Sequence, residues 1–75
     1  MATLKRAFGS TVRRLRLEAG MSQEKFAQRA RVSRNFQGSV ERGEYSLTIE
    51  VAERFAKTLG LTLTELFAEV EREMR

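Results

Sequence analysis

The sequence predicts an all-α fold: a compact five-helix bundle that forms one domain, residues 1–75. Apolar residues recur every three or four positions, which is the period of amphipathic helices. The chain has no proline, and its five glycines stand singly, a pattern typical of short helices joined by tight turns. A chain of 75 residues allows one small core, near the lower limit for independent folding. The expected helices cover about 4–18, 23–30, 34–42, 48–59 and 63–73.

The first expected helix carries an apolar stripe with helical spacing. The stripe consists of Leu4, Phe8, Val12, Leu15 and Ala19. Gly20 follows the stripe and is expected to end the helix. Gly9 lowers the local helix stability by up to ~1 kcal/mol, so regular helix is expected to begin near Ser10.

The segment 22–43 predicts two short helices that meet at a tight bend. Ser22 and Ser33 are residues of the N-cap type, each placed directly before one of the two helices. The first helix has a narrow apolar stripe, and the second closes on Gly43, where a left-handed backbone favours glycine. A helix, a turn of three or four residues and a second helix form the unit that fits the major groove of DNA.

The charges are unevenly distributed along the chain. Residues 1–42 hold ten Lys and Arg against three Glu, a net charge of +7, whereas residues 43–75 hold four against seven, a net charge of −3. Because the basic half also contains the two short helices, the segregation suggests that this half meets a polyanion. The alternative is that these charges are merely solvated helix faces.

The composition argues against an enzyme. The chain has neither cysteine nor histidine, which excludes the usual nucleophile–base pairs and nearly all zinc chemistry. We therefore expect no catalytic residues, no metal site and no cofactor. The sequence has no apolar run of the ~20 residues needed to span a membrane, and its start, MATLKRAFG, lacks the apolar stretch of a signal peptide. A cytoplasmic location is the default expectation.

The last two helices have clear start and stop signals. Thr48 is expected to cap the fourth helix, and Gly60 to end it. Thr62 and Glu65 have the spacing of a capping box at the start of the fifth helix.

The fifth helix carries more apolar residues than a domain of this size can bury. Leu63, Leu66 and Phe67 are expected to lie in the core. Val70 and Met74 then remain as surplus apolar surface, which suggests a two-fold dimer interface. The alternative is a frayed C-terminal turn.

The run VRRLRLEAGMSQEKFAQRARVSRN, followed by VERG, resembles the phage repressor and Cro family of helix-turn-helix proteins, also called the xenobiotic-response-element type. The matching features are LR, G-x-S-Q, FA, VSR and ERG, in that order along the chain. GEYSLTIEVAERFAKTLGLTLTELF is similar to the family's fourth and fifth helices, so the resemblance covers about residues 8–68. It implies a lambda-repressor-like DNA-binding domain. The stretch around ERG and SLT also resembles the small controller proteins of restriction–modification systems.

The resemblance implies a DNA site on the second and third helices. Gln23 would bond a phosphate at a helix N-terminus. The positions that would face the groove are Ser33, Arg34, Asn35, Gly38 and Ser39. A guanidinium suits guanine and an amide suits adenine, so Arg34 and Asn35 have the chemistry to read bases. Arg42 would hold the backbone.

The resemblance also implies a salt bridge between Arg16 and Glu41, which would join the first helix to the third; the alternative is two independent surface charges. Two positions depart from the family's pattern. Arg31 stands at a bend where glycine is usual, and Gln37 stands where an aliphatic residue normally faces the core. Phe36 either takes over part of that packing or lies against the DNA backbone. With Gly38 also in it, the third helix is expected to be less firmly built than usual.

The function expected from these features is a sequence-specific transcriptional regulator in a prokaryotic cytoplasm, associated with the nucleoid. It would bind double-stranded DNA as a homodimer, with residues 34–42 in the major groove and half-sites about 34–36 Å apart on a near-palindromic operator. RNA polymerase or another protein is left open as a further partner. The alternative is a helix-turn-helix-shaped interaction module, or an antitoxin that binds a protein through its C-terminal helix.

Overall fold

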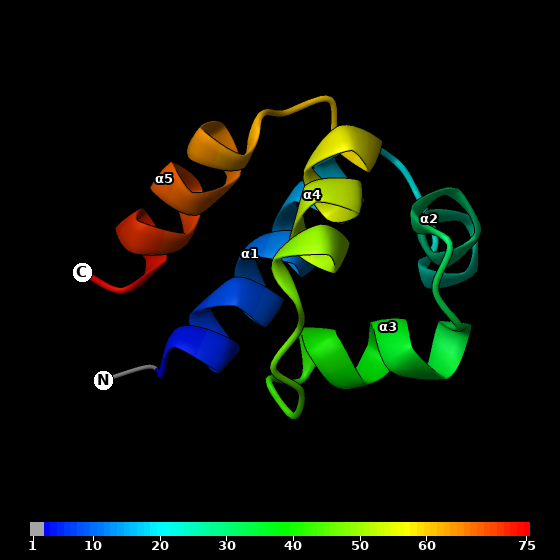
Figure 1. The fold of residues 1–75 in the computed structure, drawn as a ribbon, viewed down its shortest axis with the longest axis horizontal. Helices are drawn as coiled ribbons and strands as arrows, with labels where there is room; N and C mark the ends of the chain where they lie inside the picture. Colours follow the sequence, from blue (N-terminus) through cyan, green and yellow to red (C-terminus); the bar gives the residue numbers. More distant parts are fainter. Residues whose placement is uncertain (1–2) are drawn as a thin grey trace.

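The computed structural model describes residues 3–75, which form five α-helices (Figure 1). The helices are α1 (Leu4–Glu18), α2 (Gln23–Ala30), α3 (Arg34–Glu41), α4 (Ile49–Thr58) and α5 (Leu63–Glu73). The all-α prediction is confirmed, and the predicted ranges 4–18, 23–30, 34–42, 48–59 and 63–73 agree with the structure to within one residue at each end. The predicted domain also includes residues 1–2, which lie outside the described residues. No helix between residues 3 and 75 is long and apolar enough to cross a bilayer.

All five helices begin in the same way. A serine or threonine precedes each one in extended conformation, and its hydroxyl oxygen accepts the backbone N–H three residues further on. These caps are Thr3, Ser22, Ser33, Thr48 and Thr62. Each satisfies a donor that has no partner within its helix. The fifth helix adds the expected capping box, in which Glu65 reaches back to the backbone N–H of Thr62.

The bend between α2 and α3 depends on a left-handed arginine. Arg31 has φ 61° and ψ 46°, and it is the one non-glycine residue with positive φ in the part of the chain that the structure describes. An L-residue in this conformation costs about 1–2 kcal/mol relative to the right-handed one. The bend therefore keeps the geometry that glycine usually provides, with some backbone strain.

The core is built around phenylalanine rings from different helices. Phe55 of α4 is fully buried, with its ring centroid 5.2 Å from that of Phe26 in an edge-on arrangement and 6.2 Å from that of Phe8. Phe67 of α5 lies 5.6 Å from Phe8, ring centroid to ring centroid. These contacts join α1, α2, α4 and α5. In Figure 1, α3 lies along the lower edge of the molecule, with α2 at its N-terminal end.

Gly9 allows α1 and α3 to approach closely. A Cβ atom at this position would collide with the carbonyl oxygen of Val40, and it would lie 2.9 Å from that of Glu41. The helix itself begins at Leu4, so the expectation that regular helix starts near Ser10 is wrong. Tertiary packing outweighs the low helix propensity of glycine here, because the contact with α3 needs the missing side chain.

The expected orientation of α5 is wrong in part. Val70 was expected on the surface, but it is 1% exposed and lies in the core one turn from fully buried Leu66. Met74 is half-buried and packs against the same core, whereas Leu63, expected inside, is 37% exposed. The surplus apolar surface predicted at Val70 and Met74 is therefore absent.

An ion-pair cluster accompanies this orientation of α5. Arg14 of α1 donates to Glu69 at 2.7 Å and to Glu73 at 3.2 Å. The two carboxylates lie on the side of α5 that faces α1, and Val70 follows Glu69 directly in the chain. Sequence periodicity did not predict this pairing, because the partners are 55 and 59 residues apart.

Candidate nucleic-acid interface

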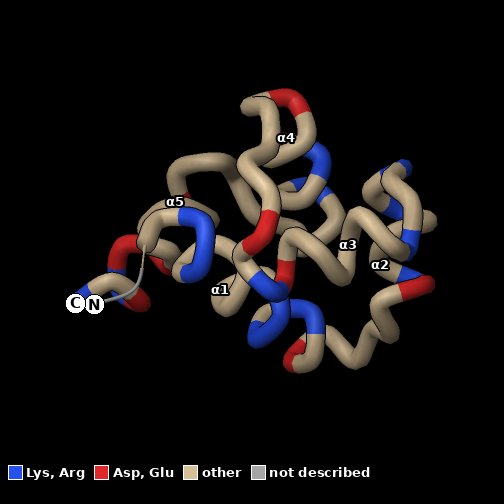
Figure 2. The backbone as a smooth tube through the Cα atoms, turned by 90° about the horizontal axis from the view of Figure 1, so that it is seen from below, with Lys and Arg blue, Asp and Glu red and all other residues tan. Residues whose placement is uncertain are grey.

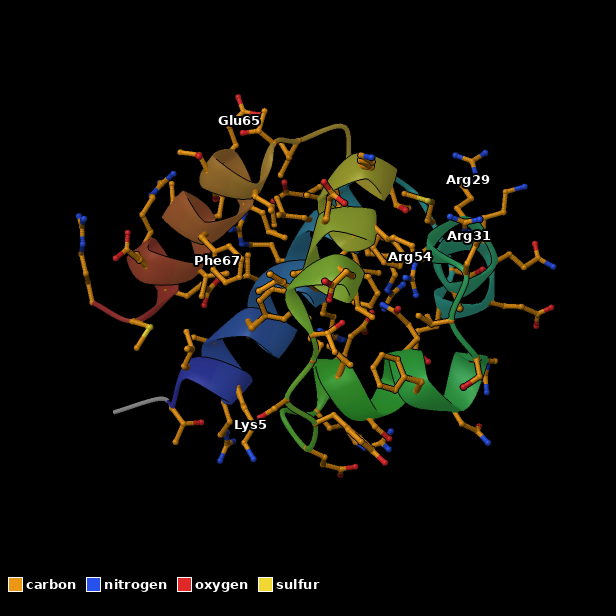
Figure 3. The ribbon with its side chains drawn as sticks, in the orientation of Figure 1. Lys5, Arg29, Arg31, Arg54, Glu65 and Phe67 are labelled. Atoms are coloured by element: carbon orange, nitrogen blue, oxygen red, sulfur yellow. The ribbon has the colours of Figure 1, made fainter. Side chains whose placement is uncertain are left out.

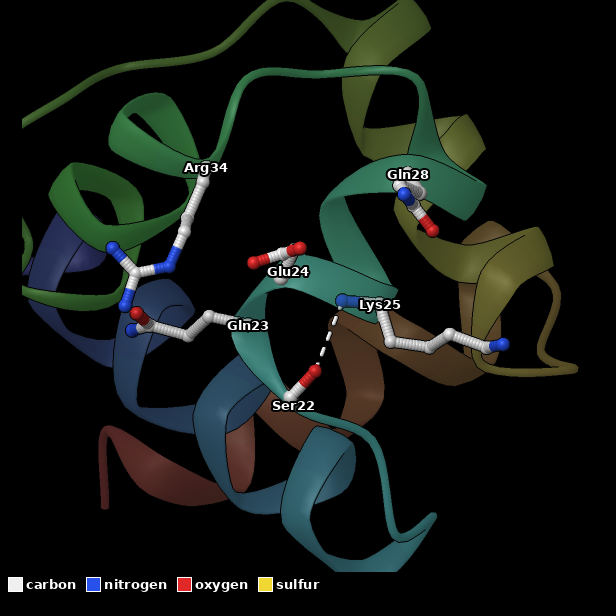
Figure 4. Close-up of a pocket in the computed structure, with 6 residues that line it drawn as sticks. All are labelled: Ser22, Gln23, Glu24, Lys25, Gln28 and Arg34. Atoms are coloured by element: carbon white, nitrogen blue, oxygen red, sulfur yellow. Dashed lines mark hydrogen bonds between the residues drawn. The ribbon is translucent and has the colours of Figure 1, made fainter.

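The start of α2 and the start of α3 border an open surface hollow of about 470 Å³ (Figure 4). It is lined by Ser22, Gln23, Glu24, Lys25, Gln28 and Arg34. Figure 4 shows Arg34 and Gln23 extending toward each other from the two helices. Lys25 and Gln28 were not predicted as site residues, although their place on the polar side of α2 was a usable signal. The hollow thus joins a helix N-terminus to a free guanidinium.

Arg34 and Asn35 form the exposed first turn of α3. Neither side chain donates or accepts a hydrogen bond within the part of the chain that the structure describes, residues 3–75. The two predicted base-reading side chains are therefore accessible and keep their full hydrogen-bonding capacity. The guanidinium offers a fork of donors, and the amide offers both a donor and an acceptor.

The other predicted groove-facing residues are less free. The Ser33 hydroxyl accepts the backbone N–H of Phe36 at 3.0 Å, so it serves as the α3 cap. Ser39 is half-buried, and its hydroxyl accepts a hydrogen bond from Arg42 at 3.3 Å. Phe36 is half-buried against the core, and its ring lies 5.4 Å from that of Tyr45. Of the two expectations for Phe36, the structure therefore shows packing within the protein.

Arg42 lies over Gly38 on the surface of α3. Its guanidinium donates to both carboxylate oxygens of Glu44, at 3.0 and 3.2 Å. A Cβ on Gly38 would come 3.1 Å from Nη1 of Arg42, so the glycine gives the guanidinium room. The hydrogen bond raises the pKa of Arg42 and lowers the pKa of Glu44. The predicted backbone-binding cation is thus held by an exposed partner that a phosphate could replace.

A buried ion pair lies beneath this surface. Arg16 of α1 donates from Nε to Glu41 at 2.7 Å and from Nη2 at 2.9 Å, and its Nη1 donates to the Met21 carbonyl at 2.7 Å. The two charged side chains are 7% and 2% exposed. The ion pair that the resemblance implied is therefore present and buried, and it joins the end of α3 to the middle of α1.

Two amides complete the environment of this carboxylate. Gln37 is fully buried and donates to Glu41 at 2.8 Å, and Gln23 donates to it at 3.1 Å. Burial raises the pKa of Glu41, but the hydrogen bonds from Arg16, Gln37 and Gln23 outweigh it, so the pKa is lowered overall. The carboxylate is held in its charged form by donors from three helices.

Gln37 is better placed than the sequence suggested. Its Nε2 has a charged partner, whereas its Oε1 is buried with no hydrogen-bond partner among the described residues. A buried acceptor without a partner costs about 1–3 kcal/mol. The i, i+4 spacing to Glu41 was the signal that could have identified the favourable half of this arrangement.

Gln23 connects the buried network to the surface. It was predicted to bind phosphate, and it lies at the first position of α2, where backbone N–H groups favour an anion. Its side-chain amide, however, is used by Glu41 in this structure. Gln23 can reach a phosphate with its backbone N–H, or with its side chain once that internal bond is exchanged.

Basic segments border α3 on two sides. Figure 2 views the molecule from below Figure 1, the side on which α3 lies, and segments with Lys and Arg lie on both sides of α3 in this view. Acidic segments gather at the end of α5. Among residues 3–75 no three potential ligands come together in a way that could hold a metal ion. The positive charge and the side-chain donors of Arg34 and Asn35, which are unpaired within residues 3–75, thus lie on the same side of the molecule, at α2 and α3.

The chain belongs to a family of helix-turn-helix domains, whose model matches residues 7–69. Within that class it is similar to the control protein C.MunI of a Mycoplasma species, with 35% identity over 74 residues, which cover 97% of this chain and all of that protein.

Solved structures of regulators have the same fold. The restriction–modification controller protein C.Esp1396I is 27% identical, with a TM-score of 0.87 over 99% of this chain and 95% of that one. The clp gene regulator ClgR of Corynebacterium glutamicum is 25% identical, with a TM-score of 0.92 over 97% of this chain and 78% of that one. The resemblance to helix-turn-helix controller proteins is confirmed.

Proposed function

We propose that this protein is a sequence-specific DNA-binding transcriptional regulator of the controller type, and that it acts as a homodimer with α3 in the major groove of its operator. The observation that carries the proposal is the exposed start of α3. Arg34 and Asn35 there have no partner within residues 3–75, while the end of the same helix is fixed by the buried Arg16–Glu41 pair. A rigid helix that presents free donors and an acceptor is what base readout requires.

The neighbouring groups supply the contacts to the DNA backbone. The N-terminus of α2, with Gln23 and Lys25 beside it, favours a phosphate through its free N–H groups and its dipole. Arg42 lies at the other end of the same surface, and it can exchange Glu44 for a second phosphate. These contacts carry no sequence information, but they set the position of α3 on the duplex.

The relatives support the assembly. C.Esp1396I, 27% identical with a TM-score of 0.88, forms a tetramer in complex with its natural 35-base-pair operator. We infer a comparable arrangement here, built from dimers whose recognition helices lie about 34–36 Å apart in successive major grooves. The regulatory relatives also favour a protein that is not an enzyme and that works in the cytoplasm on the nucleoid.

The test is selection of bound duplexes from a random pool with the full chain, at low and at moderate salt. A two-fold motif with half-sites about one helical turn apart is the expected result. The paired variant Arg34→Ala and Asn35→Ala is expected to lose the motif. Arg75→Ala removes one positive charge at the end of the chain and is expected to keep it. Enrichment without any motif, vanishing as the salt rises, would leave only nonspecific electrostatic binding and refute the proposal.

A further inference from the structure

Four basic side chains gather where the end of α2 meets α4. Arg29, Arg31, Arg54 and Lys57 line an open hollow of about 320 Å³ together with Thr58, and no carboxylate lines it. We call these four basic residues the α2–α4 basic surface. None of them forms an ion pair with another residue between 3 and 75. In Figure 3 the three arginines lie on the α2 side of the molecule, away from Lys5 and Phe67.

Arg54 is held in place by the bend before α3. Its Nε donates to the carbonyl oxygen of Ala30 at 2.8 Å, and its Nη2 donates to that of Arg31 at 3.5 Å. These bonds cap the C-terminal end of α2, which gives Arg54 a structural role. They do not account for Arg29 and Lys57, which are exposed and make no side-chain hydrogen bond in the described part of the chain. Like charges placed together repel one another, so the surface favours an anion from outside the protein.

Arg31 adds a cation at a position where its backbone is strained. Its φ of 61° is a left-handed conformation that glycine adopts without steric cost. Strain of this kind is concentrated at positions that bind ligands. The arginine supplies a charge to the hollow that glycine would not supply.

The α2–α4 basic surface continues the surface proposed to bind DNA. Lys25 lines the hollow between the starts of α2 and α3, and Arg29 lines the hollow at the end of α2. Their four-residue spacing places both on the same side of the helix. The eight residues of α2 span about 12 Å, which corresponds to about three or four phosphates of one DNA strand. One row of cations therefore leads from the N-terminus of α2 to α4.

We propose that the α2–α4 basic surface binds phosphates of the operator duplex outside the half-site that α3 reads. The inference rests on the proposed function and adds a second backbone-binding site to it. In Figure 1 α3 lies along the lower edge of the molecule, and in Figure 3, which has the same orientation, the three arginines lie above it. The duplex therefore has to bend toward α2 to reach them. Bending costs least at flexible pyrimidine–purine steps, so the sequence outside the half-sites affects affinity without any base contact.

The anion is DNA rather than a protein carboxylate for two reasons. The row of cations starts at a helix N-terminus that favours a phosphate, so the same duplex can supply the next ones. A second copy of this chain offers few free carboxylates on α5, because Glu69 and Glu73 bind Arg14 of their own chain.

The test measures affinity by fluorescence anisotropy for two duplexes: the selected operator alone, and the same operator extended at each end by about one helical turn, roughly 10 base pairs. The variant is Arg29→Gln with Lys57→Gln. Both residues are exposed on helices, and glutamine is a good helix former, so the variant keeps its fold. The control, Arg72→Gln with Arg75→Gln, removes the same charge from exposed positions at the end of the chain.

The added ends are expected to raise the affinity of the unchanged protein about tenfold at low salt, because further phosphates are neutralised. The slope of log affinity against log salt should steepen by about two to four units, since each of two protomers neutralises one or two more phosphates. The control is expected to keep this gain. The Arg29 and Lys57 variant is expected to lose most of it and to bind the short operator as the control does. Ethylation interference on the long duplex locates the phosphates beyond each half-site.

Equal gains for the Arg29 and Lys57 variant and for the control would overturn the inference. An unchanged protein that gains nothing from the added ends would overturn it as well, and would leave the surface to an acidic partner protein. In both cases specific binding to the short operator still supports the proposed function, so only the second site would be wrong. Failure of the unchanged protein to bind the short operator specifically would instead be failure of the proposed function.

Discussion

Two ion pairs end α3, and they differ in burial. Arg16 and Glu41 are 7% and 2% exposed, and the carboxylate also accepts bonds from two glutamines. Arg42 and Glu44 are 60% and 55% exposed, and these two residues lie only two positions apart in the chain. Glu41 and Arg42 are adjacent residues, but successive positions on a helix point about 100° apart, so one side chain enters the core and the other faces solvent.

The difference separates structure from binding. The buried pair has no route to a ligand, and its bonds fix α3 against α1 where Gly9 lets the helices meet. The exposed pair is screened by solvent and salt, so its arginine can change partners at little cost. The same guanidinium–carboxylate chemistry therefore fixes α3 in one place and, in the proposed function, leaves an arginine available for a DNA phosphate in the other.

The largest expected effect comes from breaking the buried pair. Arg16→Ala leaves Glu41 buried without its cation, and we expect the free energy of unfolding to fall by about 3–5 kcal/mol. Urea denaturation followed by circular dichroism measures the change. The double variant Arg16→Met with Glu41→Leu is the control, and it is expected to cost less than the single change, because no charge remains in the core. A double variant that costs as much as Arg16→Met and Glu41→Leu added together would show that the pair is not coupled.

The pH dependence of stability also tests the contribution of the buried Arg16–Glu41 pair. The pKa of Glu41 is lowered in the folded protein, so the unfolded chain binds this proton more readily. Its contribution to stability is therefore complete above the ordinary pKa of 4.5 and is lost as the pH falls through the lowered folded value. We expect urea midpoints to fall with acid in this window, and to fall less steeply in Glu41→Gln. Parallel pH profiles for the two proteins would contradict this.

A smaller effect separates the two surface arginines. Arg34→Ala should cost about 1–3 kcal/mol on the selected operator and relax the preference at one base position, because a base contact is lost. Arg42→Ala should weaken specific and nonspecific duplexes alike and reduce the slope of log affinity against log salt by about one unit, because a phosphate contact is lost. Fluorescence anisotropy with the selected and a scrambled duplex measures both. The reverse pattern would exchange the two assigned roles.

Much of this architecture could be predicted from local patterns. Caps such as Ser33 and the glycine after each of three helices determine the helix ends, and these signals act within a few residues. The bend at Arg31 was predicted from the resemblance to the helix-turn-helix family, because arginine itself does not favour a left-handed backbone.

The remainder depends on contacts between distant residues. Val70 faces inward beside buried Leu66, and on the same helix Arg14 binds Glu69 and Glu73, which are 55 and 59 residues further along the chain. Gly9, which propensity marks as a weak point, is where two helices touch. At the candidate site the residue types of Arg34 and Asn35 indicated their chemistry, but their freedom from partners, and the use of the Gln23 side chain by Glu41, required the structure.

The smallest expected effect tests whether the exposed pair restrains its arginine. Glu44→Gln removes the carboxylate that holds Arg42, and with it a negative charge close to the proposed DNA-binding surface. Because an exposed ion pair contributes little, we expect stability to remain unchanged and DNA affinity to rise only about two- to threefold at low salt. Glu71→Gln, at an exposed position of α5, changes the net charge equally and should raise affinity less. If both variants raised DNA affinity equally, the increase would come from the change in net charge alone. Glu44 would then place no restraint on phosphate binding by Arg42.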